Sequence, residues 1–202
     1  GSLWLQQSGR FISTNTNTGS LATSGLDVNG NYSFDLDEVG LGNAGGLSFD
    51  FVGTYLLSYD IQELPGGPVV ACEGKYAGTC SSLAAGGPLP VWRHKLRTTW
   101  ETPLGVDASV TWRMFSSVDQ FGVANPDPSV NRNHTLDGRH YIDLAASYNV
   151  TETWNVRIGV NNLLDKDPPV TSQTAGFSNG NTYPQTYDAQ GRYLFVGTTI
   201  DF

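Results

Sequence analysis

The residues of this chain that could do chemistry are charged side chains placed at alternate positions of otherwise apolar segments. The most prominent are Arg93, Arg97, Arg113, Asp143 and Arg157. Alternate positions of a strand share one face of a sheet, so these groups would line a common polar surface. There they could contact a substrate or another part of the protein. We favour the alternative of a solvated wall whose charges pair across strands, because a polar face carries such groups whatever it contacts.

Metal binding and covalent catalysis have weaker signals. Six oxygen-bearing residues occupy the spacing of a calcium-binding EF-hand loop: Asp27, Asn29, Asn31, Ser33, Asp35 and Glu38. Tyr32 stands where that loop needs glycine for its sharp turn, and no helical pattern flanks it. The polar side of a strand gives the same alternation. His94, His134 and His140 lack the spacing of metal ligands, and no H-E-x-x-H motif occurs. We therefore predict no metal, no cofactor and no enzymatic activity.

The two cysteines, Cys72 and Cys80, lie in the glycine-rich segment CEGKYAGTC. Their spacing does not match a zinc knuckle, and no histidine pair accompanies them. An even number of cysteines in such a loop predicts a local disulfide and an oxidising compartment.

Period-two alternation predicts the elements that position these residues. Eight strands are expected, at about 3–15, 20–35, 46–60, 92–102, 106–118, 139–149, 153–164 and 192–202. Each has about ten residues or more, longer than the ~5–6 of soluble strands and close to the ~9–11 that cross a bilayer. In the third segment, the residues expected on the apolar side are Leu47, Phe49, Phe51, Tyr55, Leu57 and Tyr59. Trp92, Trp100, Tyr148 and Trp154, near strand ends, suit the aromatic girdles of membrane barrels.

The connections between these strands alternate in length. Residues 61–91, 119–138 and 165–191 are long, whereas 103–105 and 150–152 are tight turns. Long loops at one end and short turns at the other are typical of an outer-membrane barrel. The pattern places the C-terminus on the periplasmic side and both cysteines in the longest external loop. We therefore expect an all-β fold, an antiparallel transmembrane β-barrel portion.

Composition limits the partners. The 202-residue chain has a net charge of −8 and no cluster of Lys and Arg that could neutralise phosphates, which argues against nucleic acid. No stretch approaches the ~20 apolar residues of a transmembrane helix. The chain begins GSLWLQQSG, without Met, so we interpret it as a piece of a longer protein.

The C-terminal region carries a family resemblance. WNVRIGVNNLLDKDPPV, a long loop, and then YDAQGRYLFVGTTIDF resemble the end of TonB-dependent receptors. The family's Asn-Leu-x-Asp-x-x-Pro pattern is matched by Asn162, Leu163, Asp165 and Pro168, and its Gly-Arg-Tyr entry by Gly191, Arg192 and Tyr193. An earlier family pattern is matched by Asn17, Gly25, Leu26 and Asp27. The alternating end, with Leu194, Val196, Ile200 and Phe202, resembles the signal read by the barrel-insertion machinery.

This resemblance implies that residues 1–202 are the C-terminal segment of a receptor barrel in the bacterial outer membrane. Such receptors enclose an N-terminal plug on which TonB pulls, and import a scarce nutrient such as a siderophore, vitamin, saccharide or peptide. Neither plug nor TonB box is evident here, so contact with TonB would be made through that plug. The expected partners are the lipid bilayer, the insertion machinery and an unidentified small ligand.

Two other architectures remain open from the sequence. One is a stand-alone eight-strand barrel acting as a pore or adhesin. The other is a secreted, soluble β-sandwich that binds carbohydrate, in which the apolar faces would meet each other. Loop aromatics could hold a sugar or aromatic ligand, or could pack the loops together: Phe121, Phe177, Tyr183 and Tyr187.

Overall fold

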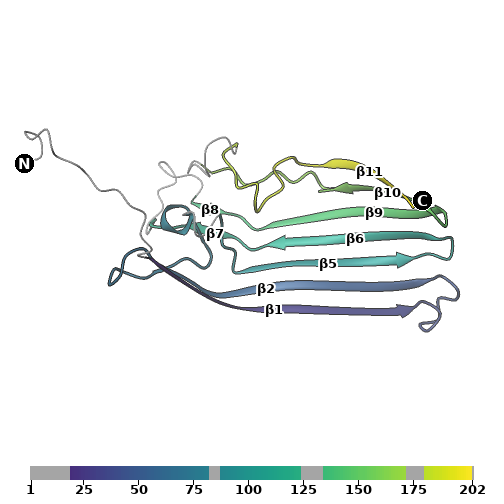
Figure 1. Ribbon diagram of the computed structural model, residues 1–202, viewed down its shortest axis with the longest axis horizontal. Coiled ribbons are helices and arrows are strands. Elements are labelled where there is room, and N and C mark those ends of the chain that lie inside the picture. The colour runs from purple at the N-terminus through teal and green to yellow at the C-terminus, as the bar shows by residue number, and fades with distance from the viewer. Residues whose placement is uncertain (1–18, 82–86, 124–133, 172–179, 202) are drawn as a thin grey trace, which may run out of the picture.

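The computed structural model describes residues 19–81, 87–123, 134–171 and 180–201. Seven long antiparallel strands form one sheet in the order β1-β2-β5-β6-β9-β10-β11 (Figure 1). Their bounds are β1 Ser20–Asp35, β2 Gly46–Gln62, β5 Trp92–Glu101, β6 Val106–Phe115, β9 Arg139–Thr151, β10 Trp154–Asn161 and β11 Tyr193–Ile200. The short β3 (Val70–Ala71) pairs with β2. None of the helical segments in this described part has the length and hydropathy of a membrane-spanning helix.

These strands confirm seven of the predicted segments, and the eighth, 3–15, lies outside the described residues. Two predicted ends were wrong. The strand expected at 106–118 stops at Phe115, because Ser116 turns to exchange hydrogen bonds with the backbone of Trp92. The strand expected at 153–164 stops at Asn161, because Asn162 has a φ of 53° that no strand continues.

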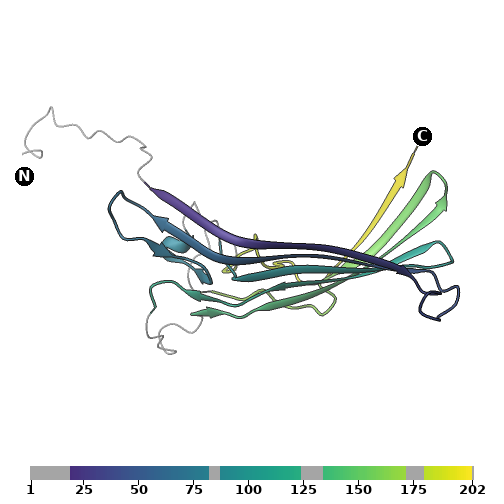
Figure 2. The ribbon, with the colours of Figure 1, turned by 90° about the horizontal axis from the view of Figure 1, so that it is seen from below.

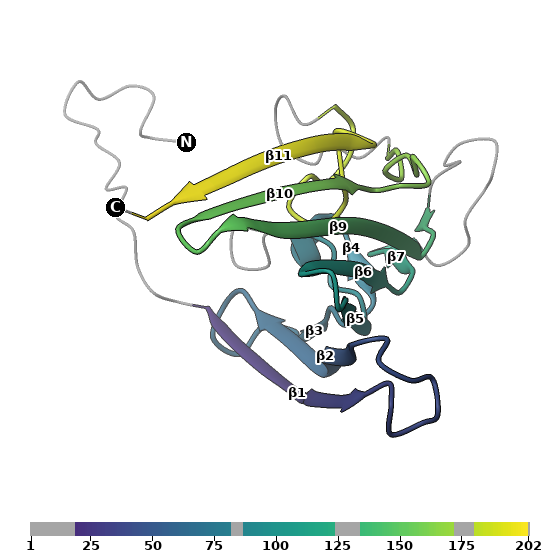
Figure 3. The same ribbon diagram turned by 90° about the vertical axis from the view of Figure 1, so that its right-hand side faces the viewer.

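The sheet is twisted and, over the described residues, does not close. Strands β1 and β11 lie at opposite edges of the sheet (Figure 3). Seen from below, β9, β10 and β11 fan away from β1 and β2 toward the end that carries the tight turns (Figure 2). We call this the turn end and the opposite end the cap end. An open sheet leaves the backbone groups of two edge strands unpaired, which in lipid is very costly.

One face of the sheet is apolar across all seven strands. The register aligns a row consisting of Phe34, Leu47, Trp100, Ala108, Ala146, Ile158 and Val196. The opposite face aligns Asn31, Asp50, Arg97, Thr111 and Asp143 in one row. No second layer of the described residues covers the apolar face, where Ile158 is 53% and Val196 is 77% exposed. A soluble sandwich would bury these side chains, so that alternative loses its support.

Aromatic rings gather at both ends of the apolar face. At the cap end, Trp112 meets the rings of His94 and His140, with centroids 4.4 and 5.9 Å away. Trp92 continues this cap-end belt toward Tyr55. At the turn end, a second belt holds Trp100, Tyr148 and Trp154. Trp92 and Trp100 are eight residues apart on β5, about 26 Å along the strand.

A β-bulge overturns one predicted face. Gly25 pairs with Leu56 and Ser24 with Ser58, so Leu57 has no opposite residue. The extra residue inverts the alternation beyond it, and Tyr59, expected on the apolar side, lines a hollow on the polar face. Glycine is required at this point because a Cβ on Gly25 would lie 2.8 Å from the carbonyl oxygen of Tyr55.

The most buried side chains of the described residues lie at one end of the sheet, in the long loops and where these loops pack on Phe115 and Tyr141. Strands β4 (Lys75–Tyr76), β7 (Val118–Gln120) and β8 (Thr135–Leu136) form a small separate sheet. Together with the buried residues Tyr76, Ala77, Val118, Leu136, Tyr183 and Tyr187 this unit is called the cap. Its members come from all three long loops, so the cap joins the hairpins at one end of the sheet.

The predicted disulfide is present beside the cap. Cys72 and Cys80 are bonded, with Cα atoms 5.3 Å apart, and the short 3-10 helix η2 (Gly78–Ser81) carries the second cysteine. Both cysteines are fully buried in a cluster with Ile61, the last apolar residue of β2. The disulfide therefore anchors the first long loop to the sheet.

Candidate functional site on the polar face

The polar face brings the predicted charged residues together. Arg93, Lys95 and Arg97 occupy alternate positions of β5, and the register sets Arg113 of β6 directly opposite Lys95. Arg157 reaches the same face from β10. A hollow of about 140 Å³ is bounded by Lys95, Arg97, Arg113, Asp143, Arg157, Phe195 and neighbouring small residues. Its charged lining consists of four cations and one carboxylate.

Arg113 is neutralised within the protein. Its guanidinium donates to both oxygens of Asp143 at 2.7 and 3.0 Å, and to both oxygens of Asp188 at 2.9 and 2.6 Å. The Tyr141 ring lies beneath it, 4.9 Å from centroid to Cζ. Because Asp188 belongs to the β10–β11 loop, this group holds that loop against the sheet. Most donors of Arg113 are thereby occupied, which favours the structural interpretation of this residue.

Three other cations of this hollow have no carboxylate partner among the described residues. No ion pair within 4 Å that involves Lys95, Arg97 or Arg157 occurs among the described residues. Arg97 donates a long hydrogen bond of 3.4 Å to Ser109, and its Nε is buried without a partner there. Arg157 lies over the ring of Phe195, with Cζ 5.4 Å from the centroid. The expected pairing of charges across strands therefore holds for Arg113 and Asp143 but, within the described part of the chain, not for these three.

A second hollow of about 390 Å³ lies on the same face, nearer the cap. Asp27, Thr54, Tyr59 and Arg93 line it, together with the segment 88–90. The Thr54 hydroxyl donates to Asp27 at 2.8 Å, which orients that carboxylate. Tyr59 was not predicted on this face, because the bulge at Leu57 inverts the alternation of β2.

The EF-hand-like spacing of oxygen-bearing residues that begins at Asp27 is explained by a β-strand. Residues Asp27 to Asp35 lie along β1, where extended backbone spreads them over about 26 Å. Oxygens so distributed cannot surround one ion. Among the described residues no group of His, Cys, Asp or Glu side chains has the arrangement of a metal site.

The family-motif residues around Asn162 form a clasp at the base of the last long loop. The Asn162 side chain is fully buried, accepts the backbone N–H of Lys166 at 2.9 Å and donates to the Lys166 carbonyl at 2.9 Å. Its own backbone N–H donates to Asp143 at 2.8 Å. Asp165 accepts the backbone N–H of Arg192 at 2.8 Å. The motif thus joins the end of β10 to the start of β11, where Tyr193 pairs with Asn161.

The other motif residues lie nearby. Gly191 has a φ of 69°, and a Cβ there would approach Asp165 to 3.0 Å, so the clasp needs glycine at this position. Leu163 accepts a hydrogen bond from the Arg192 guanidinium at 3.3 Å. Pro168 lies in the loop between β10 and β11.

The residues predicted as an assembly signal lie on the apolar face of β11. Leu194 is 81%, Val196 is 77% and Ile200 is 51% exposed. Phe202 and Asn17 lie outside the described residues. A role in assembly stays a prediction.

The loop aromatics serve packing where the structure describes them. Tyr183 and Tyr187 are buried in the cap, and Phe121 packs against the disulfide cluster. Phe177 lies outside the described residues. The hydroxyl of Tyr187 is buried without a hydrogen-bond partner in the described part of the chain, and burial raises the pKa of Tyr187 well above its ordinary value.

The chain is similar to one protein family and to several solved structures. A model of the family described as "TonB dependent receptor-like, beta-barrel" matches residues 4–163. Two solved structures of the ferric enterobactin receptor of Pseudomonas aeruginosa, one of them with enterobactin bound, are 17% and 18% identical with TM-scores of 0.54 and 0.52. The ferric-catecholate import receptor Fiu of E. coli K12 is 14% identical, with a TM-score of 0.42 over 78% of this chain and 21% of that chain. No curated protein sequence matches the chain.

The aligned region is a large share of this chain but a small share of each enterobactin receptor. The two enterobactin-receptor structures match 89% of this chain but only 22% of their own length. This chain therefore spans about a fifth of the receptors whose fold it shares. The family model, in contrast, covers most of the chain. The protein belongs to the TonB-dependent receptor-like β-barrel family.

Proposed function

We propose that this chain is the C-terminal part of the barrel of an outer-membrane receptor that imports a scarce nutrient with energy from TonB. The observation that carries the proposal is the division of the sheet into an apolar and a polar face across all seven strands. Family membership and the clasp motif next to the last strand support the assignment to a receptor barrel.

The apolar face suits a bilayer. Outer-membrane barrels present an apolar band about 25 Å tall between two aromatic girdles. The belts at the cap end and the turn end bound such a band here. In this arrangement the cap faces the outside and the tight turns face the periplasm, where TonB would act through a plug.

The polar face suits the lumen of that barrel. Large outer-membrane transporters hold a plug inside the barrel. Lys95, Arg97 and Arg157 would face the substrate or the plug, and their unpaired charges favour an anionic partner among the possible siderophores, vitamins, saccharides and peptides. The receptor would bind and release its ligand without covalent chemistry. The cap would hold the external loops in position around the entrance.

Uptake measurements test this proposal. The natural gene is deleted from its bacterium, and uptake of radiolabelled ferric siderophore, vitamin B12, oligosaccharide and peptide probes is compared with that of the complemented strain. We expect the protein in the outer-membrane fraction, and uptake of one probe class that falls to background without the gene or without TonB. Recovery of the protein in the soluble fraction, or uptake that does not depend on TonB, would refute the proposal.

A further inference from the structure

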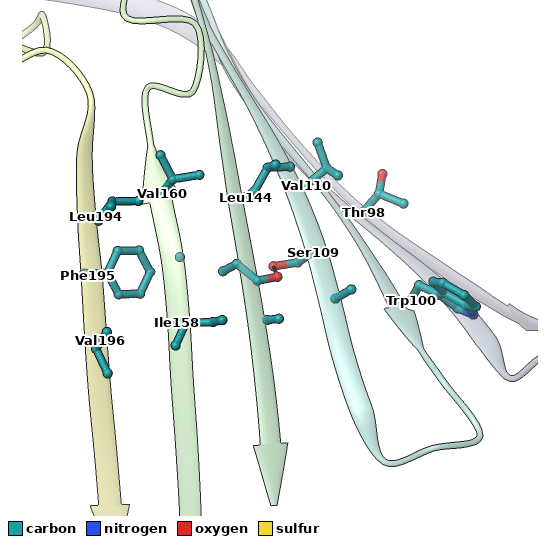
Figure 4. A pocket seen from close by; sticks show the side chains of 14 residues that line it. Thr98, Trp100, Ser109, Val110, Leu144, Ile158, Val160, Leu194, Phe195 and Val196 are labelled. Atoms are coloured by element: carbon teal, nitrogen blue, oxygen red, sulfur yellow. Dashed lines mark hydrogen bonds between the residues drawn. The ribbon is translucent and has the colours of Figure 1, made fainter.

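The apolar face carries a hollow of about 660 Å³ (Figure 4). Five strands line it, from β5 to β11. Side chains of the apolar face line it, among them Trp100, Ala108, Val110, Leu144, Ala146 and Ile158. It is open on its outer side, since Leu194 is 81% and Val196 is 77% exposed.

Two adjacent alanines create this outer hollow. Ala108 and Ala146 are direct partners in the register, and the large side chains of Trp100 and Ile158 flank them in the same row. Two methyl groups between such neighbours leave the volume of larger side chains unfilled. Val110 and Leu144 form the next row and wall the hollow on the side toward the cap.

The chemistry of the lining limits the occupant. No charged side chain lines the outer hollow, and the polar side-chain groups there are the Thr98 hydroxyl and the Trp100 indole N–H, which donates to the carbonyl of Ala44 at 2.8 Å. A ligand that needs ion pairs or many hydrogen bonds finds no partners there. A hydrocarbon chain needs none.

The position of the outer hollow matches one leaflet of a membrane. It begins beside the turn-end belt, since Trp100 lines it and Tyr148 follows Ala146 by two residues on β9. From β5 to β11 it crosses four strand spacings, about 19 Å. One leaflet of a bilayer is about 15 Å of hydrocarbon. Strands in such barrels tilt by about 35–45°, so a chain lying across them extends obliquely through the leaflet.

We propose that the outer hollow binds one acyl chain of a phospholipid from the periplasmic leaflet, as a retained lipid and not as part of the fluid shell. The inference rests on the proposed function, which places the apolar face in the outer membrane with the turn end toward the periplasm. The bound chain fills the space that Ala108 and Ala146 leave open.

Native mass spectrometry of the receptor, extracted in mild detergent from its own outer membrane, tests the proposal. We expect a population that carries one phospholipid mass in the wild type. Ala146→Phe fills the outer hollow from its floor and is expected to reduce that population at least tenfold. Val28→Phe introduces the same side chain on the apolar face of β1, outside the outer hollow, and is expected to leave that population unchanged.

A second variant and a second measurement make the test independent of any single substitution. Ala108→Leu replaces Ala146→Phe if the latter fails to reach the membrane. Quenching of Trp100 by phospholipids brominated on the acyl chain, obtained as the difference between wild type and Trp100→Phe, should fall in the filled variants. Equal phospholipid retention in filled and control variants would overturn the proposal, as would a dimer that the filled variants dissociate. Neither result bears on the proposed receptor function. Failure of that function would instead appear as loss of the outer-membrane location or of uptake.

Discussion

Arg113 of β6 and Asp188 of the last long loop are 75 residues apart in the chain and share two hydrogen bonds of 2.9 and 2.6 Å. The same guanidinium binds Asp143 on the neighbouring strand β9. One side chain therefore joins the sheet to a loop whose described residues belong to no strand.

Replacing Arg113 by Lys should release that loop. Lysine keeps the charge but cannot hold two carboxylates in bidentate geometry, and each hydrogen bond to a charged group contributes about 1.5–3 kcal/mol. We expect faster limited proteolysis within residues 163–190, with assembly of the barrel retained. Arg157→Lys is the matched control, because the contact described for Arg157 is with the Phe195 ring of β11 and not with that loop. Equal cleavage rates in the two variants would contradict this role of Arg113.

Gly159 and Phe195 form a second close pair, on the polar face. A Cβ on Gly159 would collide with the Phe195 ring and would lie 2.7 Å from the carbonyl oxygen of Leu144. The ring thus covers the bare backbone of the glycine. Gly159→Ala should lower the free energy of unfolding by about 1–3 kcal/mol, measured by urea titration in lipid vesicles. Gly197→Ala, with open space around its Cβ, should stay within about 0.5 kcal/mol of wild type, and a similar loss in both would argue against this steric account.

The disulfide between Cys72 and Cys80 should hold the cap to β2. A free-thiol assay on unreduced protein should find no reactive thiol, and two reactive thiols would refute the bond. For a ring of this size, chain entropy predicts a loss of about 2–3 kcal/mol in the double Cys→Ser variant. The loss should appear as faster proteolysis of residues 63–91, with the long strands unaffected.

Lys95 and Arg97, which form no ion pair among the described residues, give a prediction for transport. In the full receptor, Lys95→Gln combined with Arg97→Gln should raise the KM of uptake for an anionic substrate about tenfold, because at least one hydrogen bond to a charged group is lost. Asp107→Asn changes a charge on the same strand pair and serves as the control, with no comparable rise expected. An unchanged KM in the double variant would leave these cations as a solvated wall.

The sequence was sufficient to predict the long strands and the two faces, because period-two alternation is a local property of each segment. Long-range features left no such signal. Asp188 meets Arg113 through the folding of a loop, and the cap buries Tyr76 and Tyr183 from two different loops. Tyr59 was assigned to the wrong face because a single extra residue, Leu57, inverts the alternation without changing the composition of the strand.

The clasp residue Asn162 allows the contributions of backbone and side chain to be separated. Its φ of 53° costs an alanine about 1–2 kcal/mol, and its buried amide makes two hydrogen bonds of about 0.5–1.5 kcal/mol each. Asn181 has a nearly equal φ of 57° but is exposed, so Asn181→Ala should show the backbone cost alone. We therefore expect Asn162→Ala to lower the free energy of unfolding by about 1–3 kcal/mol more than Asn181→Ala does. Asn162→Gly should recover the backbone part only, and urea titrations of the three variants check the order. Equal losses for the two alanine variants would mean that the amide hydrogen bonds do not stabilise the clasp.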